Sequence, residues 1–420
     1  FQAKSTKDLN KAYWIFKLIS NNAIVKSGSI ILNIFLFLKI PILDILKATI
    51  YKHFCGGKSI KDCQNIINEL GKYKIGTILD YSVEGKETES DFERVMNEII
   101  YGIKRAQGDE KIPFSVFKIT GVGRFNLLQK INNKKSLSIH EIKEYKKIKE
   151  RVNKICQTAY NLNVPLFIDA EESWIQNTID ELTNEMMSRF NTKKPIIYNT
   201  LQMYRRDRLD YLKKCYKNAE KKNYFLGLKI VRGAYLEKER ERAEKLGYPC
   251  PIQDNKENTD KDYNLAISFC VKNIHRIAIC AGTHNEESSN KLRSLLDKKE
   301  IQKNHPHVYF SQLLGMSDHI SYNLSNQGFN VAKYVPYGPI KEMIPYLIRR
   351  ANENTSISGQ TGRELSLIIK EKKRRLNCKK ILVLGDSHTR IFKYFNHRSG
   401  YKKYIVCEVG GATRFKCFSK

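Results

Sequence analysis

Charged side chains stand at or near the ends of several short apolar runs in this chain, and they are the residues best suited to chemistry. Asp169 ends the run 164–168, while Lys118 and Lys229 belong to two other such runs. Because a carboxylate at the end of an apolar run loses hydration, Asp169 needs a compensating partner, and Lys118 or an arginine is the natural candidate. These cations, joined by Arg232, suggest a site for a small carboxylate and a phosphate-bearing cofactor.

The adjacent residues Arg349 and Arg350 suit recognition of a carboxylate, because each guanidinium presents a planar fork of donors. A solvated helix face is the simpler alternative, since one of two neighbouring helical residues usually points away from a given site. His284 is open to three readings: a core histidine, a metal ligand or a cofactor donor. Tyr334 and Tyr346 are most simply core aromatics.

Residues 76–370 contain no apparent Ser-His-Asp arrangement, no HExxH and no carboxylate–histidine cluster, so we expect neither a catalytic triad nor a metal site there. The chain has ten cysteines without a CxxC pair, which is typical of scattered intracellular thiols.

Short β-rich runs alternate with longer amphipathic stretches after a helical arm at residues 1–75. The runs are 76–82, 114–120, 165–171, 196–204, 225–235, 277–284, 308–315 and 330–338. Strand–helix alternation predicts a parallel sheet, and eight units are what a closed (β/α)8 barrel requires. The sequence therefore predicts an α/β barrel over residues 76–370. An open, doubly wound sheet ranks second, because no GxGxxG turn follows an early strand.

The ends of these runs are rich in charged and hydrogen-bonding groups, whereas structural strand ends more often carry turn residues. In a (β/α)8 barrel the active site lies at the C-terminal ends of the strands. We therefore expect these groups to converge on one rim of the barrel.

The formal net charge of +30 raises the question of nucleic-acid binding. The lysines are spread along the chain and interleaved with acids, as in residues 143–150, which is typical of solvated helix faces. No nucleic-acid-binding signature accompanies them, so we expect no nucleic-acid partner. Attraction to an anionic lipid surface is retained as an alternative.

The most apolar stretch, residues 30–38, is shorter than the ~20 residues needed to cross a bilayer. We expect a helix packed on the barrel, with a helix lying in a membrane surface as the alternative.

Seven short motifs at these positions resemble, in order, those of the proline dehydrogenases. They are DYSVEG at 80–85, DAE at 169–171, YNTLQMY at 198–204, VRGAY at 231–235, GTHN at 282–285, QLLGM at 312–316 and PYLIRRANEN at 345–354. The resemblance covers residues 1 to about 375 and is to the monofunctional enzymes.

The resemblance implies an enzyme that binds FAD at the barrel mouth, oxidises L-proline to Δ¹-pyrroline-5-carboxylate and passes the electrons to a membrane quinone. Its location would be cytoplasmic, peripheral on the inner face of a membrane, or on the matrix side of the mitochondrial membrane in a eukaryote. Hydroxyproline oxidation on the same fold is the alternative.

Site residues carry over motif by motif. The resemblance implies that Asp169 and Lys229 are catalytic. The remaining assignments are Lys118, Arg349 and Arg350 to the proline carboxylate; Leu313, Tyr334 and Tyr346 to the proline ring; Asp80 and Glu84 to a gate at the entrance; and Ala170, Gln202, Arg232, Gly233, Ala234, Thr283 and His284 to FAD.

The character of the sequence changes near Cys378. Residues 381–388, with Ser387, resemble the first block of SGNH/GDSL-type hydrolases. The blocks that would supply the base do not follow, and a serine without its base is not a nucleophile. We expect a linker at 371–379 and a truncated fragment at 380–420.

Two other function classes remain as alternatives. In the first, the chain is a hydrolase acting through the 381–388 segment. In the second, the barrel is a non-catalytic basic binding module.

Overall fold

The computed structural model describes residues 4–19, 50–82, 85–356, 360–379, 391–393 and 404–406. The chain forms two compact units, one of residues 28–352 and one of residues 1–27 together with 353–420. The larger unit holds every residue assigned above to the site.

Eight parallel strands close into a barrel in chain order within the larger unit. They are β1 (Ile75–Tyr81), β2 (Phe114–Phe117), β3 (Leu166–Ile168), β4 (Ile197–Gln202), β5 (Leu226–Val231), β6 (Ile277–Gly282), β7 (Val308–Leu313) and β8 (Val331–Tyr337). The register of β1 with β8 runs from Ile75 opposite Val331 to Tyr81 opposite Tyr337, and this pairing closes the sheet. The (β/α)8 prediction is confirmed, and the open doubly wound alternative is wrong.

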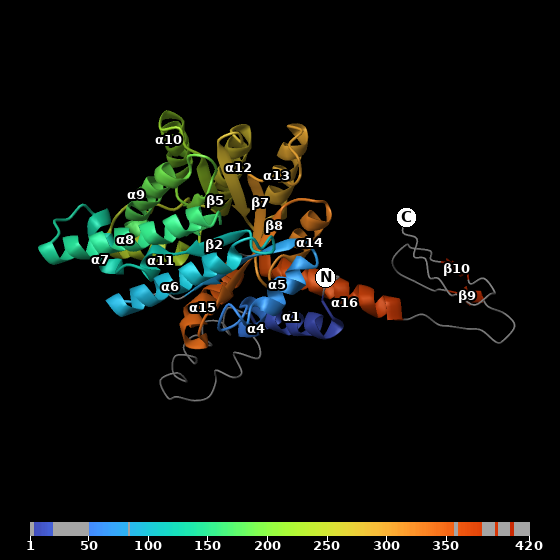
Figure 1. Ribbon diagram of the computed structural model, residues 1–420. Helices are drawn as coiled ribbons and strands as arrows, with labels where there is room; N and C mark the ends of the chain where they lie inside the picture. Colours follow the sequence, from blue (N-terminus) through green and yellow to red (C-terminus); the bar gives the residue numbers. More distant parts are fainter. Residues whose placement is uncertain are drawn as a thin grey trace, which may run out of the picture. The chain divides into compact units, whose positions relative to one another are not determined.

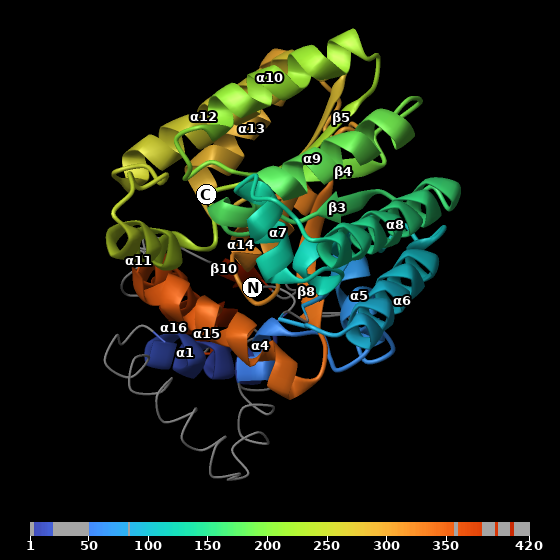
Figure 2. The ribbon, with the colours of Figure 1, turned by 90° about the vertical axis from the view of Figure 1, so that its left-hand side faces the viewer.

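Helices surround the barrel, and α6, α8 and α9 lie side by side on its outer face (Figures 1 and 2). The helices of the larger unit are α4 (Lys52–Phe54), α5 (Gln64–Gly71), α6 (Glu89–Ala106), α7 (Phe125–Asn132), α8 (Ile139–Asn161), α9 (Ser173–Phe190), α10 (Arg208–Lys221), α11 (Leu236–Leu246), α12 (Lys256–Lys272), α13 (Glu286–Lys298), α14 (Asp318–Asn326) and the first part of α15 (Ile340–Ser356). Helix α5, from the expected N-terminal arm, packs directly on β1.

Aromatic rings fill the inside of the barrel. Phe114 of β2 stacks on Phe167 of β3 with ring centroids 4.4 Å apart, and Tyr198 of β4 meets both rings edge-on. Strand residues alternate between the two faces, so these inward positions share one layer while their neighbours pack against the helices. This layer of rings, which we call the aromatic floor, lies beneath the charged strand ends.

Strands β2 and β3 are shorter than the runs predicted for them. The run 114–120 leaves the sheet at Phe117 and continues as the 3₁₀ turn η2 (Ile119–Gly121), and the run 165–171 leaves it at Ile168. Beyond these points side chains accept backbone hydrogen bonds in place of a neighbouring strand. One example is the backbone N–H of Thr120, which donates to Oε1 of Glu171 at 3.1 Å. The polar ends of both runs are thereby free of the sheet and face the barrel mouth.

The smaller unit pairs α1 (Thr6–Ile19) with α16 (Gln360–Lys379). Leu9 of α1 and Ile368 of α16 are buried, and the ammonium of Lys372 lies 4.1 Å from the ring centroid of Tyr13. The stretch 371–379, expected as a linker, is the end of α16, where Glu371 pairs with arginines one turn away.

Ser387 with its motif lies outside the described residues, and so does the apolar stretch 30–38. The fragment 380–420 contains one described antiparallel pair of strands, β9 (Ile391–Lys393) and β10 (Tyr404–Val406). Within the described part of the chain, no helix has the length and apolar character that a membrane span requires.

Candidate functional site

A buried ion cluster stands on the aromatic floor at the C-terminal rim of the barrel. Asp169 directly follows β3 and forms an ion pair with Lys229 of β5. Nζ of Lys118, directly after β2, lies 3.6 Å from Oδ2 of the same carboxylate. The expected cation beside Asp169 is therefore present twice, and the ends of β2, β3 and β5 contribute to one cluster.

Tyr334 of β8 completes this cluster from the other side of the barrel. Nζ of Lys229 donates a hydrogen bond of 2.6 Å to the Tyr334 hydroxyl and lies 4.5 Å from the centroid of that ring. The same ammonium lies 5.4 Å from the ring centroid of Phe167. Two electron-rich faces and one carboxylate thus hold the lysine charge in place.

The pKa values of two rim carboxylates are shifted in opposite directions. Burial acts to raise the pKa of Asp169, but attraction from Lys229 and Lys118 outweighs it and leaves that pKa lowered. Burial raises the pKa of Asp80, and the opposing effect of Lys118, whose Nζ is 4.0 Å from Oδ2, is too weak to reverse it. Ser82 donates a 2.5 Å hydrogen bond to Asp80. Of the two, Asp169 is the carboxylate whose charged form is favoured by its neighbours. Glu84, the other residue expected at the gate and the expected partner of Arg349, lies outside the described residues.

Arg232, at the end of β5, is anchored by α12 and α13. Its Nε donates to Oδ1 of Asp260 at 2.6 Å, and its two terminal nitrogens donate to Oγ1 of Thr283 at 2.5 Å and Oγ of Ser288 at 2.9 Å. The guanidinium also lies 4.4 Å from the ring centroid of Tyr263. Two predicted cofactor residues, Arg232 and Thr283, are thus in direct contact.

Two more of the predicted cofactor residues, Gln202 and Ala234, lie on a chain of hydrogen bonds that links the ends of β3, β4 and β5. Gln202 donates from Nε2 to the Glu171 carbonyl at 2.8 Å and accepts from the Ala234 N–H at 3.0 Å. Gly233, between the strand end and Ala234, has φ +147°, and a Cβ there would stand 2.4 Å from Cγ of Tyr204. Glycine is therefore required at this position by both conformation and space.

His284 is half-buried on the β6 side of the rim. Its Nδ1 lies 2.9 Å from Oγ of Ser317. Burial, together with the positive charges of Lys333, Arg350 and Arg232, lowers the pKa of His284 to about 3. The imidazole is therefore neutral at physiological pH. Among the described residues there is no group of three or more metal-ligating side chains.

Lys333 was not singled out from the sequence, yet it organises the β7 side of the rim. It is fully buried on the outer face of β8, where it pairs with Oδ1 of Asp318 at 2.7 Å. It also donates to the carbonyl oxygens of Met316 at 2.7 Å and Leu313 at 3.3 Å. A lysine within the apolar run 331–335 was the available signal. Leu313, a predicted ring contact, is therefore held through its backbone.

Arg349 and Arg350 of α15 have different surroundings. Arg350 is buried, with its guanidinium 5.1 Å from the ring centroid of Tyr346, and its charge acts on His284. Arg349 lines a cavity beside the barrel mouth. The two guanidiniums are thus placed differently, as the alternation of a helix surface predicts for adjacent residues.

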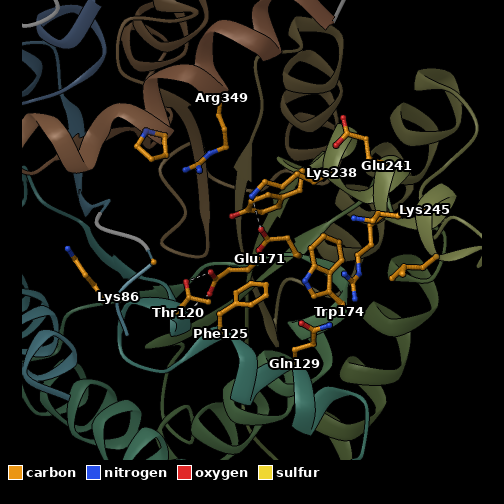
Figure 3. Close-up of a pocket in the computed structure, with 16 residues that line it drawn as sticks. Lys86, Thr120, Phe125, Gln129, Glu171, Trp174, Lys238, Glu241, Lys245 and Arg349 are labelled. Atoms are coloured by element: carbon orange, nitrogen blue, oxygen red, sulfur yellow. Dashed lines mark hydrogen bonds and ion pairs between the residues drawn. The ribbon is translucent and has the colours of Figure 1, made fainter. Parts of the chain in front are cut away.

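This cavity, which we call the Glu171 cavity, has a volume of about 770 Å³ and an open side. Its lining residues are Gly85, Lys86, Thr120, Phe125, Gln129, Glu171, Glu172, Trp174, Tyr235, Lys238, Glu241, Arg242, Lys245, Leu246, Pro345 and Arg349. Figure 3 shows Thr120 joined to Glu171, and Arg349 reaching in from α15. Cavities of this size accommodate molecules much larger than an amino acid.

Glu171 is the second residue that sequence reasoning missed. The backbone N–H and the hydroxyl of Thr120 both donate to its carboxyl group. Burial, with a contribution from the neighbouring charge of Glu172, raises the pKa of Glu171 to about 8. Glu171 follows Asp169 by two residues in the chain, but it favours the protonated form at neutral pH.

Comparison with known proteins matches the chain to one family. A family model described as proline dehydrogenase matches residues 63–363. The chain is 34% identical to proline dehydrogenase 1, mitochondrial, of Dictyostelium discoideum, over 90% of this chain and 74% of that protein. It is 34% identical to the carbapenem antibiotics biosynthesis protein CarD of Pectobacterium carotovorum subsp. carotovorum, over 77% of this chain and 84% of that protein.

The fold also resembles solved structures. Proline utilization A (PutA) from Bdellovibrio bacteriovorus, inactivated by N-propargylglycine, aligns with a TM-score of 0.68 and 19% identity. The alignment covers 96% of this chain and 42% of that one. At this identity the likeness supports the barrel fold alone.

The raised pKa of Glu171 predicts a pH dependence of stability. The folded chain holds a proton there up to pH about 8, whereas the unfolded chain releases it near pH ~4.3. Stability falls with rising pH wherever the folded state binds more protons, so we expect Glu171 to lower the free energy of unfolding between about pH 5 and about pH 8. Urea unfolding of Glu171→Gln should show a shallower decline over this range. The exposed carboxylate variant Glu181→Gln is the control, and identical slopes for Glu171→Gln and wild type would contradict the expectation.

Proposed function

The chain belongs to the proline dehydrogenase family and is an oxidoreductase, and on this basis we propose that it oxidises L-proline to Δ¹-pyrroline-5-carboxylate with FAD as cofactor and a quinone as electron acceptor. The observation that carries the proposal is the Lys118–Asp169–Lys229 cluster with Tyr334 at the barrel mouth. Two buried ammonium groups at the rim suit an anionic substrate beside an electron-accepting ring.

The residues of the rim fit FAD. Arg232 and the backbone around Gly233 offer donors to a phosphate-bearing group, and His284 is a neutral ring that neither adds nor removes charge. In the proposal Ala170, Gln202, Ala234 and Thr283 complete this set. When bound, the flavin supplies the acceptor for a hydride from the proline ring.

Lys118, Arg349 and Arg350 hold the proline carboxylate in the proposed complex. Guanidinium and ammonium groups give charge-assisted hydrogen bonds to a carboxylate, and these fix the ring in one orientation. Leu313, Tyr334 and Tyr346 pack against that ring. Holding the reacting carbon in line is itself a large part of the rate enhancement, because a positioned reaction avoids the entropy of encounter.

Asp169 and Lys229 are the catalytic pair of the proposal. Because its pKa is lowered, Asp169 is a poor proton acceptor at neutral pH, and its contribution is to keep two lysine charges in fixed positions. Lys229 then presents a positive charge toward the region that becomes electron-rich on reduction. Asp80 stands at the entrance as part of the proposed gate.

The acceptor and the location follow from the same proposal. A membrane quinone requires access to a lipid surface, so we place the protein peripherally on the inner face of a membrane. Proline dehydrogenase 1 of Dictyostelium discoideum is described as mitochondrial, which supports the matrix side for a eukaryotic source.

A spectrum of the purified protein tests the proposal directly. We expect a yellow preparation with flavin absorbance that bleaches when L-proline is added without oxygen. The full chain assayed for ester hydrolysis is the comparison, because the hydrolase alternative predicts turnover there and no bleaching. A colourless protein that fails to take up FAD would contradict the proposal.

Arg350→Met should raise the KM for proline about tenfold or more while FAD stays bound. The reason is the loss of one charge-assisted hydrogen bond to the carboxylate, worth roughly 1.5–3 kcal/mol. Steady-state kinetics and flavin absorbance after gel filtration measure the two effects. The exposed Arg240→Met is the matched control, and an unchanged KM in Arg350→Met would remove this arginine from the carboxylate site.

Asp169→Ala should lower kcat/KM by about 100-fold or more, because two buried lysines lose their counter-charge. Asp169→Asn keeps the shape without the charge, so an equal loss in both variants assigns the effect to electrostatics. Recovery of wild-type turnover in the asparagine variant would show that the charge is dispensable.

A further inference from the structure

A dehydrogenase that passes electrons onward needs a place for its second substrate, and the rim described so far is assigned to proline and the cofactor. We propose that the Glu171 cavity binds the quinone ring of the electron acceptor, and that Glu171, acting through the Thr120 hydroxyl, donates a proton to that ring as it is reduced. The inference rests on the proposed function and adds the acceptor's binding site to it.

The cavity and the ion cluster are adjacent because the same two chain segments contribute to both. Thr120 follows Lys118 by two residues, and Glu171 follows Asp169 by two residues, so two strand ends of the barrel each contribute to both places. Two residues of chain separate their Cα atoms by at most about 7 Å in any conformation. A ring held against Thr120 and Glu171 therefore lies beside the ion cluster. Arg349, which is proposed to bind the proline carboxylate, lines the same cavity and marks the border between the two positions.

The walls of the cavity suit a planar ring. Phe125, Trp174 and Tyr235 contribute aromatic faces, which pack favourably against other π-systems. Arg242 lies 4.5 Å from the ring centroid of Trp174 and fixes that side chain. Leu246 is 56% exposed at the edge of the cavity, which gives an apolar route for an isoprenoid tail toward the open side.

The charges of the lining suit a group that gains electrons. Lys86, Lys238, Arg242 and Lys245 line the cavity together with three glutamates (Figure 3). Glu172 pairs with Lys238 at 3.1 Å, and Lys86 pairs with Glu342 at 3.2 Å. Arg242 and Lys245 then stand against Glu241 and Glu171, and Glu171 favours the protonated form at neutral pH. The remaining positive charge is positioned before reaction, so it stabilises negative charge that develops on the ring oxygens.

The proton inventory of the step is complete with Glu171. Reduction of a quinone to a hydroquinone consumes two electrons and two protons. The reduced cofactor would supply both electrons and the one proton it carries, and Glu171 supplies the second proton through Thr120. In this step the protonated carboxyl donates to Oγ1 of Thr120 while the Thr120 hydroxyl passes its own proton to the ring, so the hydrogen bond between the two residues runs opposite to the one in the structure. Because burial and Glu172 raise the pKa of Glu171 to about 8, this carboxyl holds its proton at neutral pH. The resulting carboxylate regains a proton from solvent at the open side.

Binding is measured through tryptophan fluorescence. The chain has two tryptophans, Trp14 and Trp174, and only Trp174 lines the cavity. In Trp14→Phe, ubiquinone-1 should quench the fluorescence of Trp174 in a saturable manner. In the matched variant Trp174→Phe, the exposed Trp14 should show linear collisional quenching alone. Tetrahydrofuran-2-carboxylate, a proline analogue without the amine, should leave the saturable curve unshifted. Linear quenching in both variants, or displacement of the quinone by the analogue, would overturn the proposal; the latter would identify the cavity as the proline entrance.

The proton role is measured by separating the half-reactions in stopped flow. In Glu171→Gln, flavin bleaching by proline should stay within about twofold of wild type, while reoxidation by ubiquinone-1 should slow about tenfold or more. Wild-type reoxidation should decline as the pH rises through about 8, and the variant should lack this decline. Thr120→Val should reproduce the slowing, and Glu181→Gln should match wild type.

Equal reoxidation rates in Glu171→Gln, Thr120→Val and wild type would remove the proton role. Failure of the wild type to bleach with proline would instead refute the proposed function. The fluorescence titration needs no proline, so the two failures are distinguishable.

Discussion

The site depends on keeping one buried carboxylate, Asp169, ionised between two lysines. Lys118 and Lys229 come from different strands, so their ion pairs with Asp169 fix the ends of β2, β3 and β5 relative to one another. Removing one partner of such a buried set typically costs about 3–5 kcal/mol, because a charge is left without compensation. The aromatic layer packs beneath the cluster, and its Phe167 and Tyr334 rings lie close to the Lys229 ammonium. The same interactions therefore hold the strand ends in place and set the geometry of the site.

Three further cations of the rim have different surroundings. Lys333 is fully buried, and it donates its hydrogen bonds to Asp318 and two backbone carbonyls. Arg232 pairs with Asp260. Arg349 lines the Glu171 cavity. A count of positive residues in the sequence could not distinguish these surroundings.

Sequence reasoning reached the barrel and the Asp169 cluster because both follow from local patterns. Eight β-rich runs predict eight strands, and parallel strands bring their C-terminal ends to one rim. The role of Lys333 was not predicted, because its partner, Asp318, belongs to a helix that comes close to Lys333 only in the folded chain. The different surroundings of Arg349 and Arg350 depend on the rotation of α15. The protonation of Glu171 depends on enclosure by segments distant in sequence.

Asp169 and Glu171 show how neighbouring charges, rather than residue type or burial, decide the protonation of a carboxyl group. They are two residues apart, both buried and both carboxylic acids, yet the pKa of Asp169 is lowered while that of Glu171 is raised to about 8. The difference is the neighbours: Asp169 has two lysines, whereas Glu171 has the like charge of Glu172 and a threonine. In the proposed reaction one loop thus provides a permanent negative charge for the hydride step and a transferable proton for the step that follows. Exchanging the two environments would leave each step without the group it needs.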